Sequence, residues 1–361
     1  MKKDDRLFGV VKMMLEIKKQ NILELDRNAL VSWLAERRIE SYRADQILKW
    51  LYTRQTDLFD QMTNLSKELR VLLADHFTID RLKTEHITTS KDGTHKYLFE
   101  LKDGKRIESV LIPERDHYTL CLSSQVGCAQ GCDFCLTAKL GIQRNLSMAE
   151  MVSQVRDIKN DLKDPKSLTN LVFMGMGEPL ANYRNLVAAI RIITDGGFGF
   201  AFAGRRVTVS TAGLAARLAD LGRDTRANLA VSLNAADNDT RSRLMPINRK
   251  YPIEKLLDAC RHFPLRGGRR ITFEYVLLKN VNDAADDAHR LAKLLRPIKS
   301  KINLIPFNSH PGCPYQRSTE DTILRFQKIL IDKSYTVMIR RSKGQDISAA
   351  CGQLAASGTD F

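Results

Sequence analysis

Apolar side chains recur at helical intervals through the first 90 or so residues of the chain. The segments 28–34 and 44–51 show this spacing most clearly. The pattern predicts a small helical accessory module over residues 1–92. A basic helical module of this kind can dock RNA. Simple capping of a larger domain is the alternative interpretation.

From about residue 94 the polar and apolar positions alternate with a period of two. Two alternating runs, 95–101 and 106–112, flank the turn sequence Lys102-Asp-Gly-Lys. An Asp-Gly pair adopts the positive φ angles that a tight hairpin needs. We therefore predict a β-hairpin extension over residues 93–117.

Short apolar strands then alternate with helical patterns. Strands are predicted over 118–122, 171–174, 206–210, 229–233, 271–278 and 302–307, and helices over 148–162, 183–193 and 284–295. Such alternation is typical of a parallel sheet with crossover helices. Six units are too few to close an eight-stranded barrel. The predicted fold class is α/β, a partial (β/α)6 barrel over residues 118–342 whose open side admits a large substrate.

A helix over 319–333 and a strand over 336–340 complete this pattern, and a Gly-rich tail over 343–361 follows. The chain has 361 residues, 43% of them hydrophobic, which is ordinary for a globular protein. No run approaches the roughly 18 apolar residues of a membrane span, and the first residues lack the apolar core of a signal peptide. Seven cysteines without an extracellular signal indicate a reducing compartment. We expect a cytoplasmic protein without a membrane partner.

The formal net charge is +15, with a pI of about 9.5. Lys and Arg cluster at 205–206, 241–249, 266–270, 299–301 and 340–343. These clusters recur near the ends of the predicted strands, so we expect them around the active site of a barrel-type enzyme. Such an excess attracts phosphate backbones, which favours nucleic acid as the substrate. A solvated basic surface without a specific partner is the alternative.

Three cysteines stand in C-x-x-x-C-x-x-C spacing at Cys128, Cys132 and Cys135. Three thiolates can hold a [4Fe–4S] cluster with one iron open to a small ligand, and radical enzymes use this iron to bind S-adenosylmethionine. A structural zinc site would need a fourth Cys or His nearby. His117 lies eleven residues upstream, and no His follows within a hundred residues of Cys135. The spacing therefore favours the cluster.

The predicted strands end in residues that suit a cofactor. The first strand runs into the cysteine loop, and the second ends in Gly175-Met-Gly-Glu-Pro, where Glu178 offers a carboxylate to a cationic group such as the methionyl amino group. Asn308 has an amide that could read an adenine edge. The expected cofactor-binding residues are Gly177, Glu178, Ser210, Ser232, Leu233, Asn234 and Asn308. Turns and helix caps are the alternative for each position.

Several motifs together resemble those of one enzyme family. They are the three cysteines, 174–179, 207–211, 305–308 and 346–354. This set is similar to that of the radical S-adenosylmethionine RNA methyltransferases that modify adenine, most closely the bacterial branch that methylates C2 of adenosine in 23S rRNA and tRNA. The similarity runs from about residue 20 to the Gly-Gln-Leu segment of the tail.

The resemblance implies roles for residues outside the cluster motif. Cys351 matches the residue that accepts a methyl group, Cys121 matches its transient disulfide partner, and Glu108 matches the proton acceptor. The 5′-deoxyadenosyl radical would take hydrogen from the methyl on Cys351, and the resulting methylene radical would add to the electron-poor C2 of adenine. Attack by the Cys121 thiolate on the Cys351 sulfur would then release the product.

The same resemblance implies two S-adenosylmethionine molecules per turnover, one [4Fe–4S] cluster per chain, and an electron donor such as flavodoxin or ferredoxin. Two alternatives stay open. A related enzyme that methylates C8 of the adenine in 23S rRNA would share the cysteines. A non-catalytic, zinc-dependent RNA-binding protein would share the charge.

Overall fold

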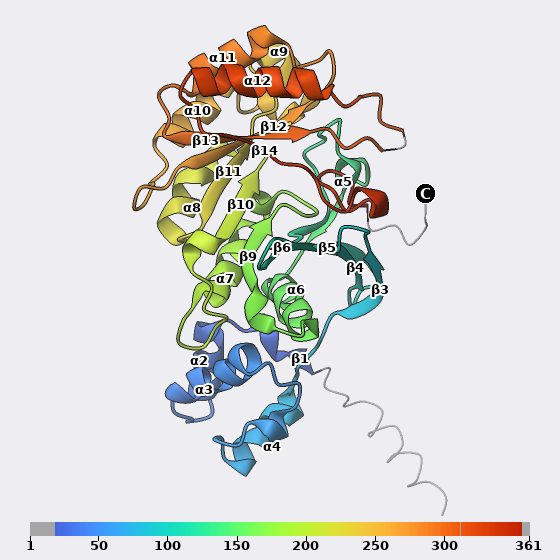
Figure 1. The fold of residues 1–361 in the computed structure, drawn as a ribbon. Helices are drawn as coiled ribbons and strands as arrows, with labels where there is room; N and C mark the ends of the chain where they lie inside the picture. Colours follow the sequence, from blue (N-terminus) through green and yellow to red (C-terminus); the bar gives the residue numbers. More distant parts are fainter. Residues whose placement is uncertain (1–18, 311, 356–361) are drawn as a thin grey trace, which may run out of the picture. The chain divides into compact units, whose positions relative to one another are not determined.

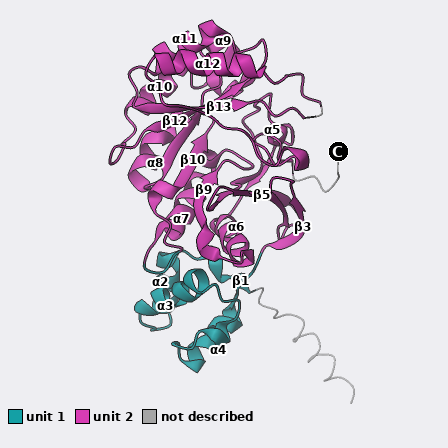
Figure 2. Cartoon of the chain, viewed as in Figure 1, with its two compact units in different colours: residues 1–81, 197–199 teal, residues 82–196, 200–361 magenta. Residues whose placement is uncertain are grey.

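The computed structural model describes residues 19–310 and 312–355 (Figure 1). Residues 1–18 of the predicted accessory module and 356–361 of the predicted tail lie outside the described residues. The chain forms two compact units (Figure 2). One comprises Met1–Arg81 with Gly197–Gly199, and the other comprises Leu82–Gly196 with Phe200–Phe361. The divisions at residues 92, 117 and 342 stay predictions.

The first unit is helical, as the apolar spacing predicts. Its helices are α2 (Arg27–Ala35), α3 (Tyr42–Leu48) and α4 (Lys67–His76), with a π-helical turn over Lys49–Thr53 and 3-10 turns over Ile22–Glu24 and Phe59–Gln61. Strands β1 (Gln20–Asn21) and β2 (Phe77–Thr78) pair in parallel. Asp26 and Ser66 cap α2 and α4, each accepting a hydrogen bond from a backbone N–H of the first turn. Leu30, Leu34 and Leu73 are fully buried in this unit.

The second unit contains a ten-stranded sheet in the order β14-β13-β12-β11-β10-β9-β6-β5-β4-β3. The strands are β3 (Lys83–Thr89), β4 (His95–Glu100), β5 (Arg106–Pro113), β6 (Tyr118–Cys121), β9 (Leu168–Phe173), β10 (Val207–Thr211), β11 (Asn228–Ser232), β12 (Ile271–Leu277), β13 (Ser300–Pro306) and β14 (Val337–Ile339). From β6 to β14 the neighbours are parallel, and β3 to β6 are antiparallel. The predicted α/β class with a mostly parallel sheet is confirmed.

Helical patterns between the strands also form where the periodicity places them. The helices are α5 (Leu136–Lys139), α6 (Met148–Asp161), α7 (Tyr183–Thr194), α8 (Leu218–Asp224), α9 (Asn238–Leu244), α10 (Ile253–Arg261), α11 (Ala285–Leu295) and α12 (Glu320–Asp332). Short 3-10 turns occupy Pro165–Ser167, Pro179–Asn182, Gly204–Arg206, Ala215–Arg217, Pro246–Arg249 and Gln345–Ile347. None of the helices in the described ranges is long and apolar enough to cross a bilayer.

The predicted hairpin is present, but it has a third strand. The Asp-Gly turn joins β4 to β5, with Leu101 N donating to Lys105 O at 2.7 Å and Gly104 at φ +76°. Helix was predicted up to about residue 90, and that prediction is wrong for Lys83–Thr89, which forms β3 antiparallel to β4. Thr84, Ile87 and Thr88 are β-branched, a residue type that favours an edge strand over a helix.

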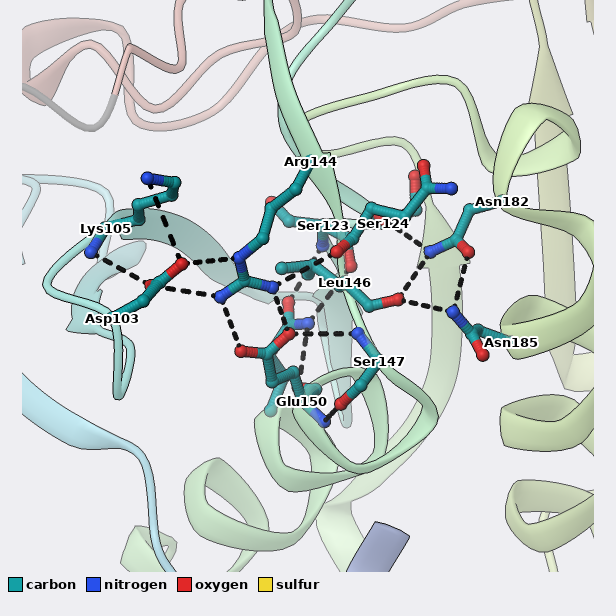
Figure 3. Close-up of polar contacts among 12 residues, drawn as sticks. Asp103, Lys105, Ser123, Ser124, Arg144, Leu146, Ser147, Glu150, Asn182 and Asn185 are labelled. Atoms are coloured by element: carbon teal, nitrogen blue, oxygen red, sulfur yellow. Dashed lines mark hydrogen bonds and ion pairs between the residues drawn. The ribbon is translucent and has the colours of Figure 1, made fainter.

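A polar network fixes the base of the cysteine loop (Figure 3). The loop leaves β7 (Gln125–Gly127) and returns through β8 (Ile142–Asn145), which pairs with β7. Arg144 donates two hydrogen bonds to the Asp103 carboxylate of the hairpin turn, at 2.7 and 3.1 Å, and two to Glu150 of α6, at 2.7 and 2.8 Å. Glu150 also completes a capping box with Ser147. One guanidinium thus joins the hairpin, the cysteine loop and α6.

Candidate active site

The three cysteines line one cavity at the carboxyl edge of the parallel strands. Of the seven expected cofactor-binding residues, Gly177, Glu178, Ser210, Ser232, Asn234 and Asn308 line the same cavity, and so does Cys351. We call it the cysteine cavity. Leu233 does not line it. Its side chain is fully buried, its N–H donates to Glu274 O at 3.0 Å, and its carbonyl accepts from Arg241 Nε.

The chemistry of the three thiols suits a group that holds them as thiolates. Burial raises the pKa of Cys128 to about 12. Burial, together with the neighbouring sulfurs of Cys135 and Cys128, raises the pKa of Cys132 well above its ordinary value. Iron ligation would supply the positive charge that these buried sulfurs need in order to ionise. Within residues 19–310 and 312–355, no three His, Cys, Asp or Glu side chains converge on a single-ion site. The three thiols and the adjoining carboxylate fit a cluster with one open iron.

The cysteine loop rests on a small apolar cluster. Leu244, Met245, Leu278 and Phe307 form the buried part of this cluster, and Cys132 and Phe134 pack against it. Polar contacts add to this support, since Asp133 N donates to Leu244 O at 3.0 Å and Tyr315 Oη donates to Asp133 Oδ2 at 2.6 Å. The loop is therefore positioned by the end of α9 and by segments that follow β12 and β13, all distant in the sequence.

Glu178 is a buried carboxylate held by backbone donors. Its Oε2 accepts from Ala212 N at 2.7 Å, and its Oε1 accepts from Leu180 N at 3.0 Å. Burial raises the pKa of this carboxyl to about 7, against the lowering effect of those hydrogen bonds. A cation in the cysteine cavity would favour the ionised form.

The glycines before Glu178 have a packing role that the sequence analysis did not predict. In the structure, a Cβ on Gly177 would lie 2.5 Å from Gln125 Cβ, and the residue has φ +99°. A Cβ on Gly175 would lie 2.8 Å from the carbonyl of Leu122. Both residues also line the cysteine cavity. Their lack of a side chain brings the end of β9 against the segment that enters the cysteine loop.

The remaining strand-end residues are already engaged with the protein. Ser210 Oγ donates to Glu274 Oε2 at 3.2 Å. Asn234 has φ +57°, and its Oδ1 accepts from Val276 N at 2.8 Å. Asn308 Nδ2 donates to Ser342 Oγ at 2.9 Å and to the Cys351 carbonyl at 3.5 Å. These side chains thus contribute to the shape of the cavity wall.

The tail is anchored across the mouth of this site. Leu136 N donates to Gly352 O at 2.8 Å, and Thr137 Oγ1 donates to Leu354 O at 2.6 Å, so the tail lies beside α5 (Figure 1). Further back, the Asp346 carboxylate accepts from Ser90 Oγ at 2.5 Å in the β3–β4 turn. Cys351 is held between these two anchors.

A second cavity adjoins Cys351. Cys121, Cys351, Arg340, Glu114 and Met174 are among its lining residues, and we call it the tail cavity. Cys351 lines both cavities, and Cys121 lines this one. Burial, and secondly the Cys351 sulfur, raises the pKa of Cys121 to about 12, while the Arg340 guanidinium opposes the shift. The two sulfurs that the resemblance pairs therefore face a common space.

Glu108 is buried in β5 close to the end of the tail. Its Oε1 lies 3.1 Å from Lys96 Nζ, and its Oε2 accepts from Ala355 N at 2.8 Å. The carbonyl of the same residue accepts from Ser123 Oγ at 2.6 Å. The carboxylate thus lies among the elements that carry Cys121 and Cys351.

Three charged residues of this region were not predicted as site residues. Glu274 lines the cysteine cavity, Arg340 lines the tail cavity 4.0 Å from Glu274 Oε1, and Lys96 pairs with Glu108. The Cys351 sulfur, and then Glu274, raises the pKa of Arg340. Glu274 had a usable signal, because it is a lone carboxylate in an otherwise apolar strand. Arg340 had one as well, because it begins the 340–343 cluster that we expected around the active site, whereas Lys96 had none.

The basic clusters are only partly where we expected them. Clusters 205–206, 266–270 and 299–301 precede or begin strands β10, β12 and β13, so they lie at the amino edge, opposite the cavities. Arg241 is fully buried, and its guanidinium binds the carbonyls of Leu233 and Ala212. The expectation that all of these clusters surround the active site is wrong, because it did not separate the start of a strand from its end.

Comparisons with known proteins agree with this architecture. Residues 122–294 match the radical SAM superfamily, and residues 20–79 match the N-terminal domain of the ribosomal RNA large subunit methyltransferase. The chain is 43% identical to a radical SAM methyltransferase of known structure from Sphaerobacter thermophilus, with a TM-score of 0.87 over 94% of this chain and all of that one. Fold and cysteine motif thus define a radical SAM enzyme.

Two relatives narrow the family. A dual-specificity RNA methyltransferase RlmN from Desulfosudis oleivorans is 58% identical over 93% of this chain and 91% of its own length. The RlmN of Geobacter sulfurreducens is 54% identical over 94% of this chain and 92% of its own. The chain belongs to the RlmN family of radical SAM RNA methyltransferases.

Gly177→Ala should destabilise the fold by about 2–4 kcal/mol, since the new methyl overlaps Gln125 and the backbone has φ +99°. Gly196→Ala is the matched control, because nothing lies within 4 Å of its Cβ position. Urea unfolding measures both. Equal free energies of unfolding for the two variants would contradict the packing role of Gly177.

In the cluster-free protein, ionisation of Glu178 should make the free energy of unfolding depend on pH. Its folded pKa of about 7 exceeds its ordinary value of 4.5, so the folded state binds more protons between these values. The contribution of this group to the free energy of unfolding therefore falls as pH rises from 4.5 to 7, by at most about 3 kcal/mol. The stability of Glu178→Gln relative to wild type should rise across this range. A flat difference for Glu178→Gln would contradict the shift.

Proposed function

We propose that this protein methylates C2 of adenine in 23S rRNA and tRNA, with Cys351 as the carrier of the methyl group. One observation carries the proposal. Cys351 lines the cavity of the three cluster cysteines and also the cavity of Cys121. A single sulfur can therefore receive a group on one side and be released from it on the other.

The chemistry of the substrate explains why a carrier is needed. C2 of adenine lies between two ring nitrogens and is electron-poor, so it cannot attack a sulfonium methyl group. A carbon radical can add to it. Cys128, Cys132 and Cys135 would hold the [4Fe–4S] cluster, and Glu178 would bind the methionyl amino group. When bound, the cluster and S-adenosylmethionine supply the radical, and a second S-adenosylmethionine supplies the methyl group.

Different residues of the protein would then carry out the successive steps of the reaction. The Cys351 thiolate accepts the methyl group, and Arg340 lines the tail cavity beside it. Once the carbon is joined to C2, Glu108 takes the C2 proton, and the oxidised electron carrier takes up the one unpaired electron that the radical addition leaves on the ring. The Cys121 thiolate attacks the Cys351 sulfur, a disulfide bond forms as the carbon–sulfur bond breaks, and a proton completes the product methyl. Reduction of the disulfide restores both thiols.

Two contacts would keep Glu108 in position for this step. Lys96 holds one carboxylate oxygen at 3.1 Å, and the tail amide of Ala355 donates to the other. The proton acceptor is thereby tied to the same segment that carries Cys351. A cytoplasmic location and an electron donor of the flavodoxin or ferredoxin type complete the proposal.

Nucleosides from 23S rRNA and tRNA, analysed by mass spectrometry after incubation with the cluster-loaded protein, test the function. We expect 2-methyladenosine from wild type and none from Cys351→Ala, which should keep its iron and sulfide. Detection of 8-methyladenosine in place of 2-methyladenosine would show that the proposed position of methylation is wrong. Activity retained by Cys351→Ala would overturn the carrier role.

Cys121→Ala should stop the reaction after the carbon has joined the RNA, because no second sulfur can attack Cys351. A protein–RNA band should survive denaturation and shrink with nuclease to a protein carrying one modified adenosine. If Cys121 merely packs beside the cluster, the variant should instead lose iron without a cross-link. If Cys121→Ala keeps its cluster but gives no protein–RNA band, the proposed role of Cys121 in product release is wrong.

A further inference from the structure

Six arginines gather on the edge of the sheet that lies opposite the cysteine cavity. Arg205 and Arg206 immediately precede β10, Arg226 lies two residues before β11, and Arg266, Arg269 and Arg270 lie just before β12. Because β10, β11 and β12 are adjacent and parallel, their amino ends share one edge. We call these six residues the amino-edge arginines.

The side chains of three amino-edge arginines donate hydrogen bonds to neutral acceptors. Arg269 Nη1 donates to Arg226 O at 2.5 Å, which joins the segments that lead into β11 and β12. Arg206 Nη1 donates to Asn170 Oδ1 at 3.1 Å, and Arg270 Nη1 donates to Thr336 Oγ1 at 2.7 Å. The group thus has a defined arrangement without carboxylate partners.

Other arginines of the same unit are paired differently. Arg144, Arg290 and Arg341 each lie within 2.7 Å of a carboxylate oxygen. Across residues 19–310 and 312–355, no ion pair within 4.0 Å joins any amino-edge arginine to a carboxylate. The acidic groups at the margin are Asp116, which faces Arg206, and Asp224, which accepts from Tyr183.

A small cavity lies among these side chains. Arg226, Arg266, Arg269 and Arg270 line it together with neutral and apolar residues, and none of its lining residues is acidic. Its volume of about 10 Å³ is near that of a single water, so it would admit one oxygen atom of a larger anion. Four arginines line this one cavity without an acidic residue, and an anion would offset their like charges.

The spacing favours a polymer over a small anion. Adjacent strands lie about 4.8 Å apart, so the amino-edge arginines extend over roughly 10 Å from β10 to β12 and can contact more than one phosphate. Strands of five to seven residues separate this edge from the cysteine cavity by roughly 16–23 Å. A short segment around the target adenine would not reach both edges.

We propose that the amino-edge arginines bind the phosphodiester backbone of the RNA substrate at a segment remote from the methylated adenine. This inference rests on the proposed function for the identity of the polyanion. Guanidinium groups contact phosphate oxygens through paired N–H donors without reading sequence, so the surface adds affinity for a folded RNA and leaves base selection to the active site.

The proposal is tested with the triple variant Arg205→Gln/Arg226→Gln/Arg266→Gln. Unlike Arg206, Arg269 and Arg270, these three arginines make no side-chain hydrogen bond within residues 19–310 and 312–355. Arg184→Gln/Lys255→Gln/Arg325→Gln is the control, with the same loss of three charges on exposed helix positions. Binding of full-length tRNA and of a short hairpin with the target adenine is measured across a salt series, with KM and kcat.

For full-length tRNA the amino-edge variant should show an affinity lowered about tenfold, and a salt slope reduced by about 2, since each lost phosphate contact removes about 0.7. KM should rise with kcat unchanged, and the hairpin should bind as it does to wild type. Matching values for the variant and its control would overturn the proposal, and so would equal weakening toward the hairpin.

Failure of the proposed function would look different. If wild type binds full-length tRNA but never methylates it, the binding difference between the two triple variants still decides whether the surface exists. Iron content and methylation of Cys351 report separately on the active site, and both should match wild type in either triple variant.

Discussion

The close approach of the end of β9 to the segment that enters the cysteine loop is the constraint on which the site depends. Gly175 N donates to Leu122 O at 3.0 Å, Met176 N donates to Ser123 Oγ at 2.9 Å, and Glu178 N donates to the Gln125 side chain at 2.8 Å. Only glycine fits where the two backbones are nearest. The carboxylate and the first cluster cysteine are therefore placed by one piece of packing, and Arg144 secures the same loop at its base (Figure 3).

Much of this architecture could be predicted from the chain alone, because periodicity reports burial directly. A strand such as β12 is a largely apolar run, and the three cysteines can be recognised by their spacing. The edge strand β3 could not be predicted in this way, since it is largely exposed and has no clear alternation. Its β-branched threonines were the only usable signal.

The site residues likewise include some that the sequence could identify and some that it could not. Cys128 and Glu178 stand in local motifs, whereas the pairing of Lys96 with Glu108 and the approach of Arg340 to Glu274 join segments distant in the chain. The sequence-based prediction also placed Arg205 and Arg266 at the wrong edge of the sheet. A basic residue next to a strand can precede or follow it, and only the direction of the chain tells which edge it occupies. Arg241 shows a further limit, since its charge serves buried carbonyls rather than a partner.

Placing Cys351 on both cavities has a consequence for the stoichiometry of the product. In the proposed reaction the same sulfur is the loading point for the methyl group and one half of the releasing disulfide. It therefore cannot take up a second methyl group until the disulfide has been reduced. Each reduction of the disulfide therefore allows one methyl carbon to be delivered. The rate of turnover then depends on the supply of thiol reductant.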